Sequence, residues 1–285
     1  MKRILVTGAT GQLGRCIKDA ASGYPDFEIV YTTRIELDIE KEASVVEFFN
    51  QNHFDFCINT AAYTNVEQAE GESDKAFAIN AEGVRHLASA CKKHNTVLLH
   101  ISTDYVFDGK KSSAYSETDA TNPLNVYGAS KLKGEQYIQE VCEKYYIFRT
   151  SWLYSQYGHN FFKTIFKFAE ADKPLTITTE QTGTPTNAND LAMAVLDVIN
   201  MESESYGLYH YSNSGAATWY DFAEKILKLA GKLENTKLAK TNHYRTFAAR
   251  PENSVLDTLK FRSNFSVSIM DWKDSLQSVI KKTVN

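Results

Sequence analysis

The chain has 285 residues and a mass of 32.1 kDa, a length that fits roughly two domains or one large α/β unit. Hydrophobic residues make up 43% of the sequence and charged residues 23%, which excludes an intrinsically disordered chain. The net charge of -4 leaves no basic excess to hold a phosphate backbone, so we expect no nucleic-acid partner.

The cysteines and the apolar runs indicate the compartment. Cys16, Cys57, Cys91 and Cys142 are far apart and form no Cys-x-x-Cys pair, so neither a disulfide framework nor a zinc ribbon is predicted. No apolar run approaches the roughly 18 residues that span a bilayer, and the N-terminal residues lead into a glycine loop rather than a signal peptide. We therefore expect a cytoplasmic protein with no membrane partner.

Residues 1–150 alternate apolar runs of strand length with longer segments of helical period. The predicted strands are Arg3–Thr7, Glu28–Thr32, Phe56–Asn59, Val97–Ser102 and Tyr146–Thr150. The predicted helices are Gln12–Ser22, Glu42–Asn52, Ser73–His94 and Val126–Lys144. This alternation predicts an α/β fold with a Rossmann-type doubly wound parallel sheet that binds a dinucleotide.

Residues 151–285 follow a different pattern, with short strands and irregular loops between helices. These helices are predicted at Asn160–Ala171, Asn187–Asn200, Thr218–Gly231 and Asp271–Lys282. Thr218 and Asp221 resemble a capping box, and Gly231 resembles the stop of the same helix. We interpret this region as a smaller mixed α/β part that mainly binds substrate, whether or not it returns strands to the first domain. The cleft between the two parts is the expected ligand site.

Three glycines follow the first predicted strand and open the next helix. Gly8, Gly11 and Gly14 have the spacing that permits a tight turn, a close approach of a pyrophosphate and close helix packing. The helix N-terminus adds free N–H groups and a partial positive charge. The loop, with Gln12 and Leu13, is therefore predicted to bind a dinucleotide, the alternative being a purely steric use of glycine.

The residues after the second and third strands bear on the choice of cofactor. The predicted contacts are Thr33, Arg34, Asp38, Ile39, Ala61, Ala62 and Tyr63. Arg34 stands near the position where an acidic residue would exclude a 2′-phosphate, and a guanidinium can fork onto phosphate oxygens. The sequence thus favours NADPH over NADH, although Arg34 as a solvated charge at a strand end is an equally good interpretation. Packing of sheet on helix is the alternative for the small residues after the third strand.

A catalytic group is predicted on the helix that begins near residue 126. Tyr127 and Lys131 are four residues apart, so both project from one helix face. A lysine ammonium near a phenol lowers the phenol pKa from about 10, which makes tyrosine a proton donor and acceptor near neutral pH. Thr103 follows the fourth strand at the carboxyl edge of the sheet, where its hydroxyl could donate to a substrate carbonyl.

These motifs extend over nearly the whole chain. The segments are Gly8–Gly14, Asn59–Thr64, Ser102–Phe107, Asn122–Gly128, Phe148–Trp152, Gln181 with Gly183–Thr186, and Ala249–Pro251 with Asn253-Ser254. Together they resemble the extended short-chain dehydrogenase/reductases, and more narrowly the dTDP-4-dehydrorhamnose reductases. The resemblance implies reduction of the C4 ketone of dTDP-4-dehydro-L-rhamnose to dTDP-L-rhamnose, which supplies bacterial surface polysaccharide.

The resemblance also implies individual roles. Hydride would pass from the nicotinamide to C4 while Tyr127 protonates the oxygen, Lys131 lowers the phenol pKa and holds the nicotinamide ribose, and Thr103 positions the carbonyl. By the same resemblance, two further residues line the sugar site and one lies near the nucleotide diphosphate; they are Asp104, Trp152 and Arg250. The alternatives are a core aromatic for the tryptophan and a surface ion pair for the arginine.

Two departures from the family pattern leave questions open. Tyr63 stands where the family often has histidine, which should alter contacts but not chemistry. Some members bind magnesium through acidic residues at a dimer interface, and no such cluster is evident in this sequence. No metal ligand is therefore predicted, and both magnesium dependence and the choice between monomer and homodimer stay open.

Two other functions compete with reduction of a dTDP-sugar. Dehydratases of the same fold usually follow the catalytic threonine with Asp-Glu, whereas Thr103 is followed by Asp104-Tyr105, which favours a reductase over a dehydratase; another nucleotide-sugar reductase or an epimerase stays open. A non-catalytic regulatory subunit like the β subunit of methionine adenosyltransferase is the second alternative. The retained Thr103, Tyr127 and Lys131 give no reason to suppose that catalysis was lost.

Overall fold

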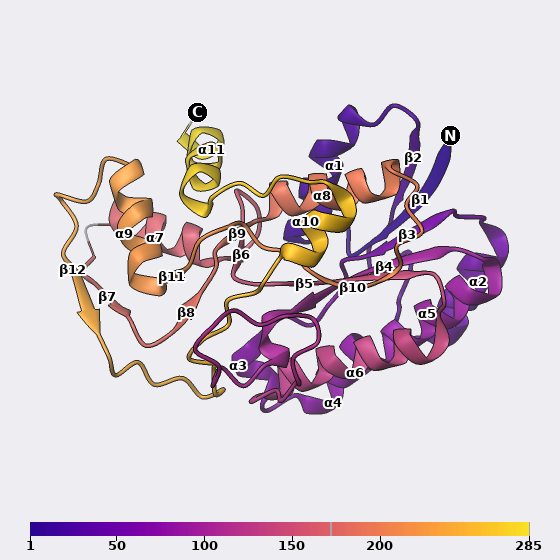
Figure 1. Cartoon of the computed structure of the whole chain (residues 1–285), viewed down its shortest axis with the longest axis horizontal. Coiled ribbons are helices and arrows are strands. Elements are labelled where there is room, and N and C mark those ends of the chain that lie inside the picture. The colour runs from indigo at the N-terminus through magenta and orange to yellow at the C-terminus, as the bar shows by residue number, and fades with distance from the viewer. Residues whose placement is uncertain (172, 285) are drawn as a thin grey trace.

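A parallel sheet forms the larger lobe of the computed structural model, which describes residues 1–171 and 173–284 (Figure 1). Its strands are β1 (Lys2–Thr7), β2 (Phe27–Tyr31), β3 (Phe56–Asn59), β4 (Val97–Thr103), β5 (Tyr145–Thr150) and β10 (Gly207–His210). They lie in the order β10-β5-β4-β3-β1-β2, and each neighbouring pair is parallel. β2 lies on one side of β1 and β3 on the other, so the direction in which successive strands are added reverses between β1 and β3. Sheets of this kind bind ligands at that point. The predicted doubly wound α/β sheet is confirmed.

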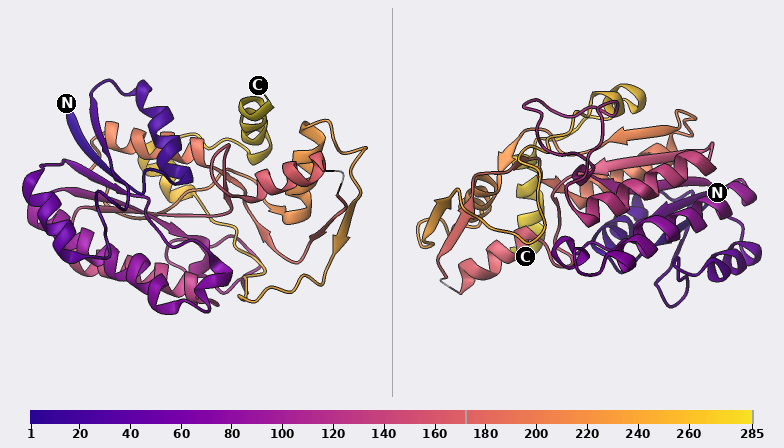
Figure 2. Two further views of the ribbon diagram at one scale, coloured as in Figure 1. Left: turned by 180° about the vertical axis from the view of Figure 1, so that it is seen from behind. Right: turned by 90° about the horizontal axis from the view of Figure 1, so that it is seen from below.

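Helices cover both faces of this sheet (Figures 1 and 2). On one face lie α1 (Gln12–Ala20), α8 (Ala188–Asn200) and α10 (Leu259–Phe265); on the other lie α2 (Glu42–Gln51), α5 (Gly83–His94) and α6 (Val126–Val141). Alternate strand residues enter the two cores, so Ile4 and Val6 face α1 and α8 whereas Leu5 faces α2 and α5. Burial on both faces explains why the strands read as continuous apolar runs.

The five strands predicted before residue 151 are confirmed to within one residue at each end. The helix predicted at Ser73–His94 differs in its middle, since a π turn at Ala78–Glu82 separates α4 (Ser73–Phe77) from α5. The wider turn carries Asn80, whose buried side chain accepts from the Tyr63 N–H and donates to its carbonyl oxygen. These two hydrogen bonds form a tertiary contact, which the hydrophobic period of the sequence does not predict.

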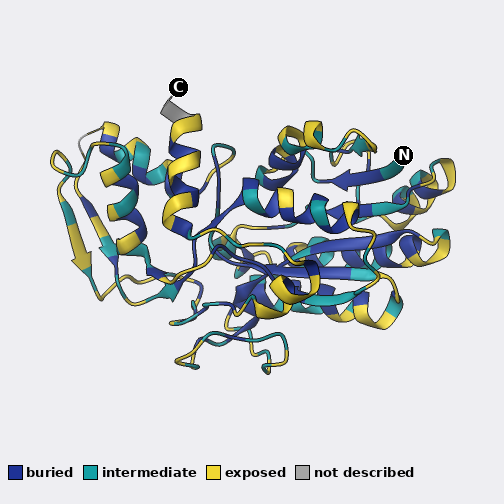
Figure 3. Ribbon diagram, turned by 45° about the horizontal axis from the view of Figure 1, so that its top comes forward, coloured by how far each residue is buried: buried dark blue, intermediate teal, exposed yellow. Residues whose placement is uncertain are grey.

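The second lobe is built from residues after 150. It contains α7 (Phe161–Glu170), α9 (Trp219–Leu229), α11 (Trp272–Val284) and the paired strands β7 (Leu175–Thr178) with β12 (Leu238–Thr241), β6 (Leu153–Tyr154) with β9 (Thr186–Asn187), and β8 (Thr182–Gly183) with β11 (Ala217–Thr218). The predicted capping box of Thr218 and Asp221 is confirmed, and Gly231 has a φ of 67° just beyond α9. The helices enclose a core of their own, visible as the dark blue inner faces in Figure 3.

The chain crosses between the two lobes several times. After β9 it returns to the sheet lobe as α8, which packs against α1, and as β10, which extends the sheet beyond β5. It then re-enters the second lobe at β11. Several crossings of the chain therefore join the two lobes. Among the helices of the described residues, none has the length and hydropathy needed to cross a bilayer.

Candidate active site

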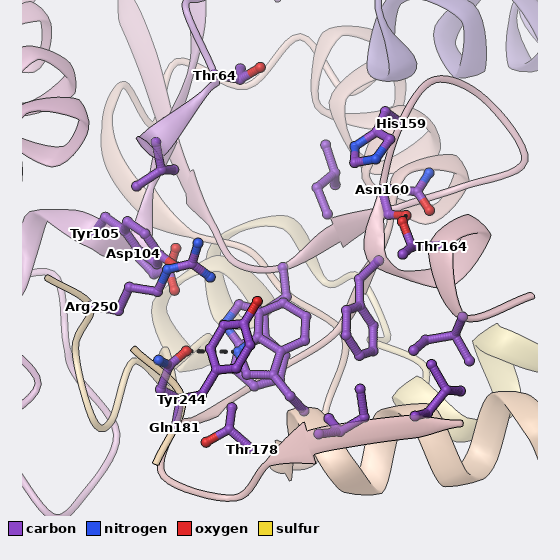
Figure 4. Close-up of a pocket in the computed structure, with 18 of the residues that line it drawn as sticks. Thr64, Asp104, Tyr105, His159, Asn160, Thr164, Thr178, Gln181, Tyr244 and Arg250 are labelled. Atoms are coloured by element: carbon purple, nitrogen blue, oxygen red, sulfur yellow. Dashed lines mark hydrogen bonds between the residues drawn. The ribbon is translucent and has the colours of Figure 1, made fainter. Parts of the chain in front are cut away.

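A cavity of about 760 Å³ lies between the lobes, beside the carboxyl ends of β4 and β5 (Figure 4). It contains five residues that the sequence singled out, namely Thr103, Asp104, Tyr127, Trp152 and Arg250. Further lining residues come from α7, β7 and α9, so both lobes contribute. In Figure 4, Arg250, Asp104 and Tyr105 lie on one side of the cavity and His159, Asn160 and Thr164 on the other. The cleft expected from the sequence is present.

Thr103 is the last residue of β4 and begins a 3-10 turn. Its hydroxyl accepts from the Tyr105 N–H at 3.1 Å and donates to Asp104 Oδ1 at 3.0 Å. The turn therefore holds the threonine hydroxyl and the aspartate carboxylate together at the sheet edge. Both side chains are buried, with 4% and 2% of their surface exposed.

Tyr127 enters the cavity from the first turn of α6. The helix start is fixed by Asn125, whose Oδ1 accepts from the Gly128 N–H at 2.8 Å. A Cβ at Gly128 would lie 2.2 Å from the Tyr105 carbonyl oxygen, so only glycine lets the helix approach the turn this closely. Burial raises the pKa of Tyr127 to about 12, although a hydrogen bond with Thr103 acts in the opposite direction. The phenol is therefore protonated at neutral pH, as a proton donor must be.

Lys131 lies behind Tyr127 rather than at the cavity surface. Its Nζ donates to the Ile101 carbonyl oxygen at 2.6 Å and lies 3.2 Å from His100 Nε2. Burial lowers the pKa of Lys131 to about 8, with the charge of Glu135 acting against it. In this state of the protein burial is the main influence on the pKa of Tyr127, so the expectation that the lysine lowers it stays a prediction.

Asp104 is a polar residue of the cavity whose hydrogen-bonding capacity is only partly used. Its Oδ2 is buried and has no hydrogen bond of normal geometry to the described residues. Burial raises the pKa of Asp104 to about 7, and contacts with Ser254 and Thr103 offset only part of the cost of the charge. A buried acceptor without a partner suits a carboxylate that receives a ligand hydroxyl.

Asp104→Asn should therefore raise the melting temperature of the free protein more at about pH 8.5 than at about pH 5. The folded-state pKa lies above the unfolded value, so the folded protein keeps a proton that the unfolded chain releases, and stability falls as pH rises toward about 7. Thermal unfolding at both pH values measures the difference. Asp119→Asn is the matched control, because contact with Lys111 lowers the pKa of Asp119 to about 2. That variant should be less stable at both pH values. An equal shift for Asp104→Asn at both pH values would contradict the prediction.

The glycine loop between β1 and α1 has the shape of an anion cradle. Gly8 has a φ of 66°, and a Cβ there would lie 2.6 Å from the Ala61 backbone nitrogen. A Cβ at Gly14 would lie 2.6 Å from Ala9 Cα, which explains the close packing of α1. Gly11 is exposed and begins α1 without a side-chain cap, so N–H groups of the first turn face outward. These residues fit the pyrophosphate of a dinucleotide.

Two residues of the loop have structural partners. Leu13 is 4% exposed and packs in the core between α1 and the sheet, so its side chain does not face a ligand. Gln12 donates to the Leu153 carbonyl oxygen at 3.2 Å and accepts from Asn160 at 2.7 Å. Its side chain thus connects the glycine loop to the second lobe at the rim of the cavity.

The predicted cofactor contacts after β2 and β3 are divided between surface and interior. Arg34 is 64% exposed and pairs with Glu40 and Asp38, at 2.5 and 3.7 Å. The Thr33 N–H donates to Glu36, and Ile39 is buried beside Gly83. After β3, Ala61 and Ala62 are half-buried, and Ala61 lies against Gly8 of the glycine loop. The Tyr63 hydroxyl donates to Glu72 at 3.0 Å.

The sequence analysis predicted Trp152 at the sugar site but missed the aromatic wall that it forms with Trp219. Trp219 stacks on Trp152 with ring centroids 3.6 Å apart and an angle of 7° between the planes. Its Nε1 donates to Gln181 Oε1 at 2.8 Å, and the Phe161 ring lies 4.6 Å from it between centroids. Gly183 is required here, because a Cβ would lie 2.5 Å from the Trp152 ring. A large aromatic residue directly after a helix cap was the feature of the sequence that could have indicated this wall, because side chains of the first helical turn usually face solvent.

Arg250 is held at the cavity by α3 (Val66–Ala69). Its Nη2 donates to Glu67 Oε1 at 2.7 Å, and the same carboxylate accepts from the N–H groups of Phe247 and Ala248. Arg250 Nε is buried and has no hydrogen-bond partner among the described residues. The carboxylate thus holds a cation beside the cavity with one donor still free. Within residues 1–171 and 173–284, no group of three acidic, histidine or cysteine side chains is placed so that it could hold a metal ion.

The doubly wound sheet, the glycine loop and the grouping of Thr103 with Tyr127 place the chain in the class of extended short-chain dehydrogenase/reductases. The profile of the RmlD substrate binding domain family matches residues 1–285. The chain belongs to the dTDP-4-dehydrorhamnose reductase family.

Individual relatives agree over the whole length. The dTDP-4-dehydrorhamnose reductase of Aggregatibacter actinomycetemcomitans is 39% identical, with 98% of each chain covered. The spore coat polysaccharide biosynthesis protein SpsK of Bacillus subtilis is 37% identical over 99% of this chain and 98% of its own. The crystal structure of dTDP-4-dehydrorhamnose reductase from Bacillus anthracis in complex with NADP has a TM-score of 0.94 and 36% identity, and covers 99% of both chains.

Proposed function

We propose that this protein reduces the C4 ketone of dTDP-4-dehydro-L-rhamnose to dTDP-L-rhamnose with NADPH, in the supply of activated rhamnose for surface polysaccharide. The observation that carries the proposal is the juxtaposition of Thr103, Asp104 and Tyr127 at one wall of a cavity that both lobes form. Membership of the reductase family supports the choice of substrate.

Each residue near the reacting carbonyl has its own role in the reduction. A bound reduced nicotinamide supplies hydride to C4, and the developing negative charge on the sugar oxygen is neutralised by the proton of Tyr127. The Thr103 hydroxyl turns its one proton from Asp104 to the same oxygen and so orients the carbonyl. Lys131 in its ammonium form adds positive charge behind the phenol, which favours loss of the tyrosine proton in the transition state.

The remaining cavity residues bind the nucleotide sugar. Asp104 Oδ2 accepts from a sugar hydroxyl, and the stacked Trp152 and Trp219 exclude water from the reacting carbon. Arg250 binds the diphosphate, with its free Nε as the first donor. Glu67 holds this arginine in place until the more highly charged diphosphate competes for it.

The choice of NADPH rests on the end of β2. Arg34 follows the strand whose end is expected to lie near the 2′-phosphate, and it is exposed enough to exchange Glu40 for a phosphate. Glycines 8, 11 and 14 hold the pyrophosphate, and Ala61 and Ala62 lie beside them at the end of β3. The four buried cysteines are unpaired, which suits a reducing cytoplasm as the place of work.

The deciding experiment follows oxidation of the nicotinamide by its absorbance. Purified protein is mixed with NADPH or NADH, and dTDP-4-dehydro-L-rhamnose is generated in place from dTDP-glucose by the upstream enzymes. We expect oxidation that depends on the final intermediate and is faster at low NADPH than at low NADH. Bound cofactor without oxidation would overturn the proposal in favour of a regulatory protein or another nucleotide sugar.

A further inference from the structure

A line of buried polar side chains crosses the sheet behind the cavity, and the reaction as described leaves most of it unused. Thr7 Oγ1 donates to Asn59 Oδ1 at 2.7 Å, Asn59 Nδ2 lies 3.0 Å from His100 Nδ1, and His100 Nε2 lies 3.2 Å from Lys131 Nζ. The four residues come from β1, β3, β4 and α6. None has more than 2% of its surface exposed. A continuous polar line in a core costs stability unless each donor meets an acceptor.

The orientation of the Asn59 amide follows from its neighbours. The Ala61 backbone N–H points at one amide atom, 3.1 Å away, and an N–H can only donate. That atom is therefore the oxygen, and the NH₂ group faces His100. Because an NH₂ group also only donates, Nδ1 of His100 has to be the acceptor and carries no proton.

The protonation of His100 then determines what Lys131 meets. The ring is fully buried beside a lysine, which lowers the pKa of His100 well below its ordinary value and leaves the imidazole neutral. A neutral ring has one proton, and with Nδ1 accepting, that proton lies on Nε2. The Nε2–H therefore points at Lys131 Nζ. An ammonium has no lone pair to accept it, whereas a neutral amine accepts it and still donates to the Ile101 carbonyl oxygen.

We propose that His100 is a positioning residue that weakens the hold of Lys131 on its proton, and that it thereby sets the alkaline limit of the reduction. The kinetic part of this proposal rests on the proposed function, since Lys131 supports Tyr127 only as an ammonium. As pH rises through the pKa of Lys131 the charge behind the phenol disappears, and kcat falls. The pKa of Tyr127 lies higher, so the lysine and not the tyrosine limits activity on the alkaline side.

The other charged groups near Lys131 do not replace this effect. Glu135, one turn further along α6, attracts the ammonium, but its carboxylate is already paired with Arg149 at 2.6 Å. Asp104 lies on the turn after β4, where its charge acts on Tyr127. Two groups of β4 contact Lys131 Nζ, namely the Ile101 carbonyl oxygen and the His100 ring. The imidazole N–H is therefore the contact that opposes the ammonium directly.

The test titrates Lys131 in the free protein, by NMR of ¹³C-labelled lysine side chains, in the unmutated protein and in His100→Gln. Glutamine can turn its amide oxygen toward Nζ, which offers the ammonium an acceptor in place of a donor. We expect the pKa of Lys131 to rise by about one unit or more, that is about tenfold in proton affinity. His210→Gln is the matched control, because His210 is also buried on the same sheet but faces Arg149 and Tyr115. It should leave the lysine titration unchanged, and an equal shift in both variants would overturn the proposal.

Two further measurements test the proposal independently of the enzyme activity and of the folding of the variant. The ¹⁵N shifts of the His100 ring in the unmutated protein report the tautomer, and a proton on Nδ1 would overturn the proposal without any substitution. In the reductase assay, the alkaline limb of the kcat profile should move upward in His100→Gln by the same amount as the lysine titration. An inactive protein with the expected tautomer and titration would reject the proposed function alone. An active protein whose alkaline limb stays in place would reject the role of His100.

Discussion

Tyr127→Phe should lower kcat for the ketone reduction by about 10³-fold and leave NADPH affinity nearly unchanged. The substitution removes the proton donor but keeps the ring, which packs edge-on against Tyr105 with centroids 6.0 Å apart. Proton transfer by a positioned group typically contributes about 10²- to 10⁴-fold. Steady-state kinetics with the dTDP-sugar and cofactor titration by fluorescence measure the two quantities separately.

A second tyrosine on α6 provides the control for that variant. Tyr137 donates its hydroxyl to Glu82 at 2.8 Å and lies about ten residues further along the helix, outside the cavity. Tyr137→Phe should keep kcat within about twofold, since a partly exposed hydrogen bond contributes little to the site. Near-normal turnover in Tyr127→Phe would show that the proton comes from another group. Loss of cofactor binding together with turnover would indicate a structural role instead.

Arg149→Met should lower the free energy of unfolding by about 3–5 kcal/mol, the second large effect that we expect. Arg149 on β5 and Glu135 on α6 are 4% and 1% exposed, with Nη2 and Oε2 2.6 Å apart and Nε and Oε1 3.0 Å apart. Ser102 on β4 also donates to Glu135. Removing the arginine leaves a carboxylate buried without its cation, which is the costly case. Urea denaturation monitored by tryptophan fluorescence measures the change.

The double variant Arg149→Met with Glu135→Met should recover most of that loss, because two apolar side chains of suitable volume remove the unpaired charge. The exposed pair of Arg85 and Glu82, with 41% and 42% of the side chains exposed, is the matched control. Arg85→Met should cost less than about 1 kcal/mol. Equal losses in the single and double variants would mean that packing rather than charge pairing determines the effect.

Much of the candidate site could be predicted from the sequence, because the residue patterns that indicate it are local. Gly8 shows why: its positive φ and the 2.6 Å approach of the Ala61 nitrogen require glycine in any fold that closes this turn. Tyr127 and Thr103 were predicted from their places at a helix start and a strand end, and the structure brings both to one cavity. The raised pKa of Tyr127 and the lowered pKa of Lys131 were not predictable, because both depend on burial, a consequence of packing.

Other parts of the site depend on contacts between distant segments. Arg250 meets Glu67 across 183 residues of sequence, and Trp152, which follows β5, meets Trp219 at the start of α9. β10 is only four residues long, and nothing in its sequence states that it will pair with β5. Asn80 occupies a π turn that the helical period conceals. Each of these features depends on which surfaces of the folded chain come into contact. A short segment of sequence contains little information about such contacts.

The sequence by itself therefore determined the fold class, the family and the local geometry of the glycine loop and of the start of α6, because strand and helix periods, turns and caps act over a few residues. Only the tertiary structure decided which side chains share the cavity, which buried groups keep their protons and how the two lobes are joined. The physical reason is that burial and pairing set the charge state of a group, and both arise from residues far away in the chain.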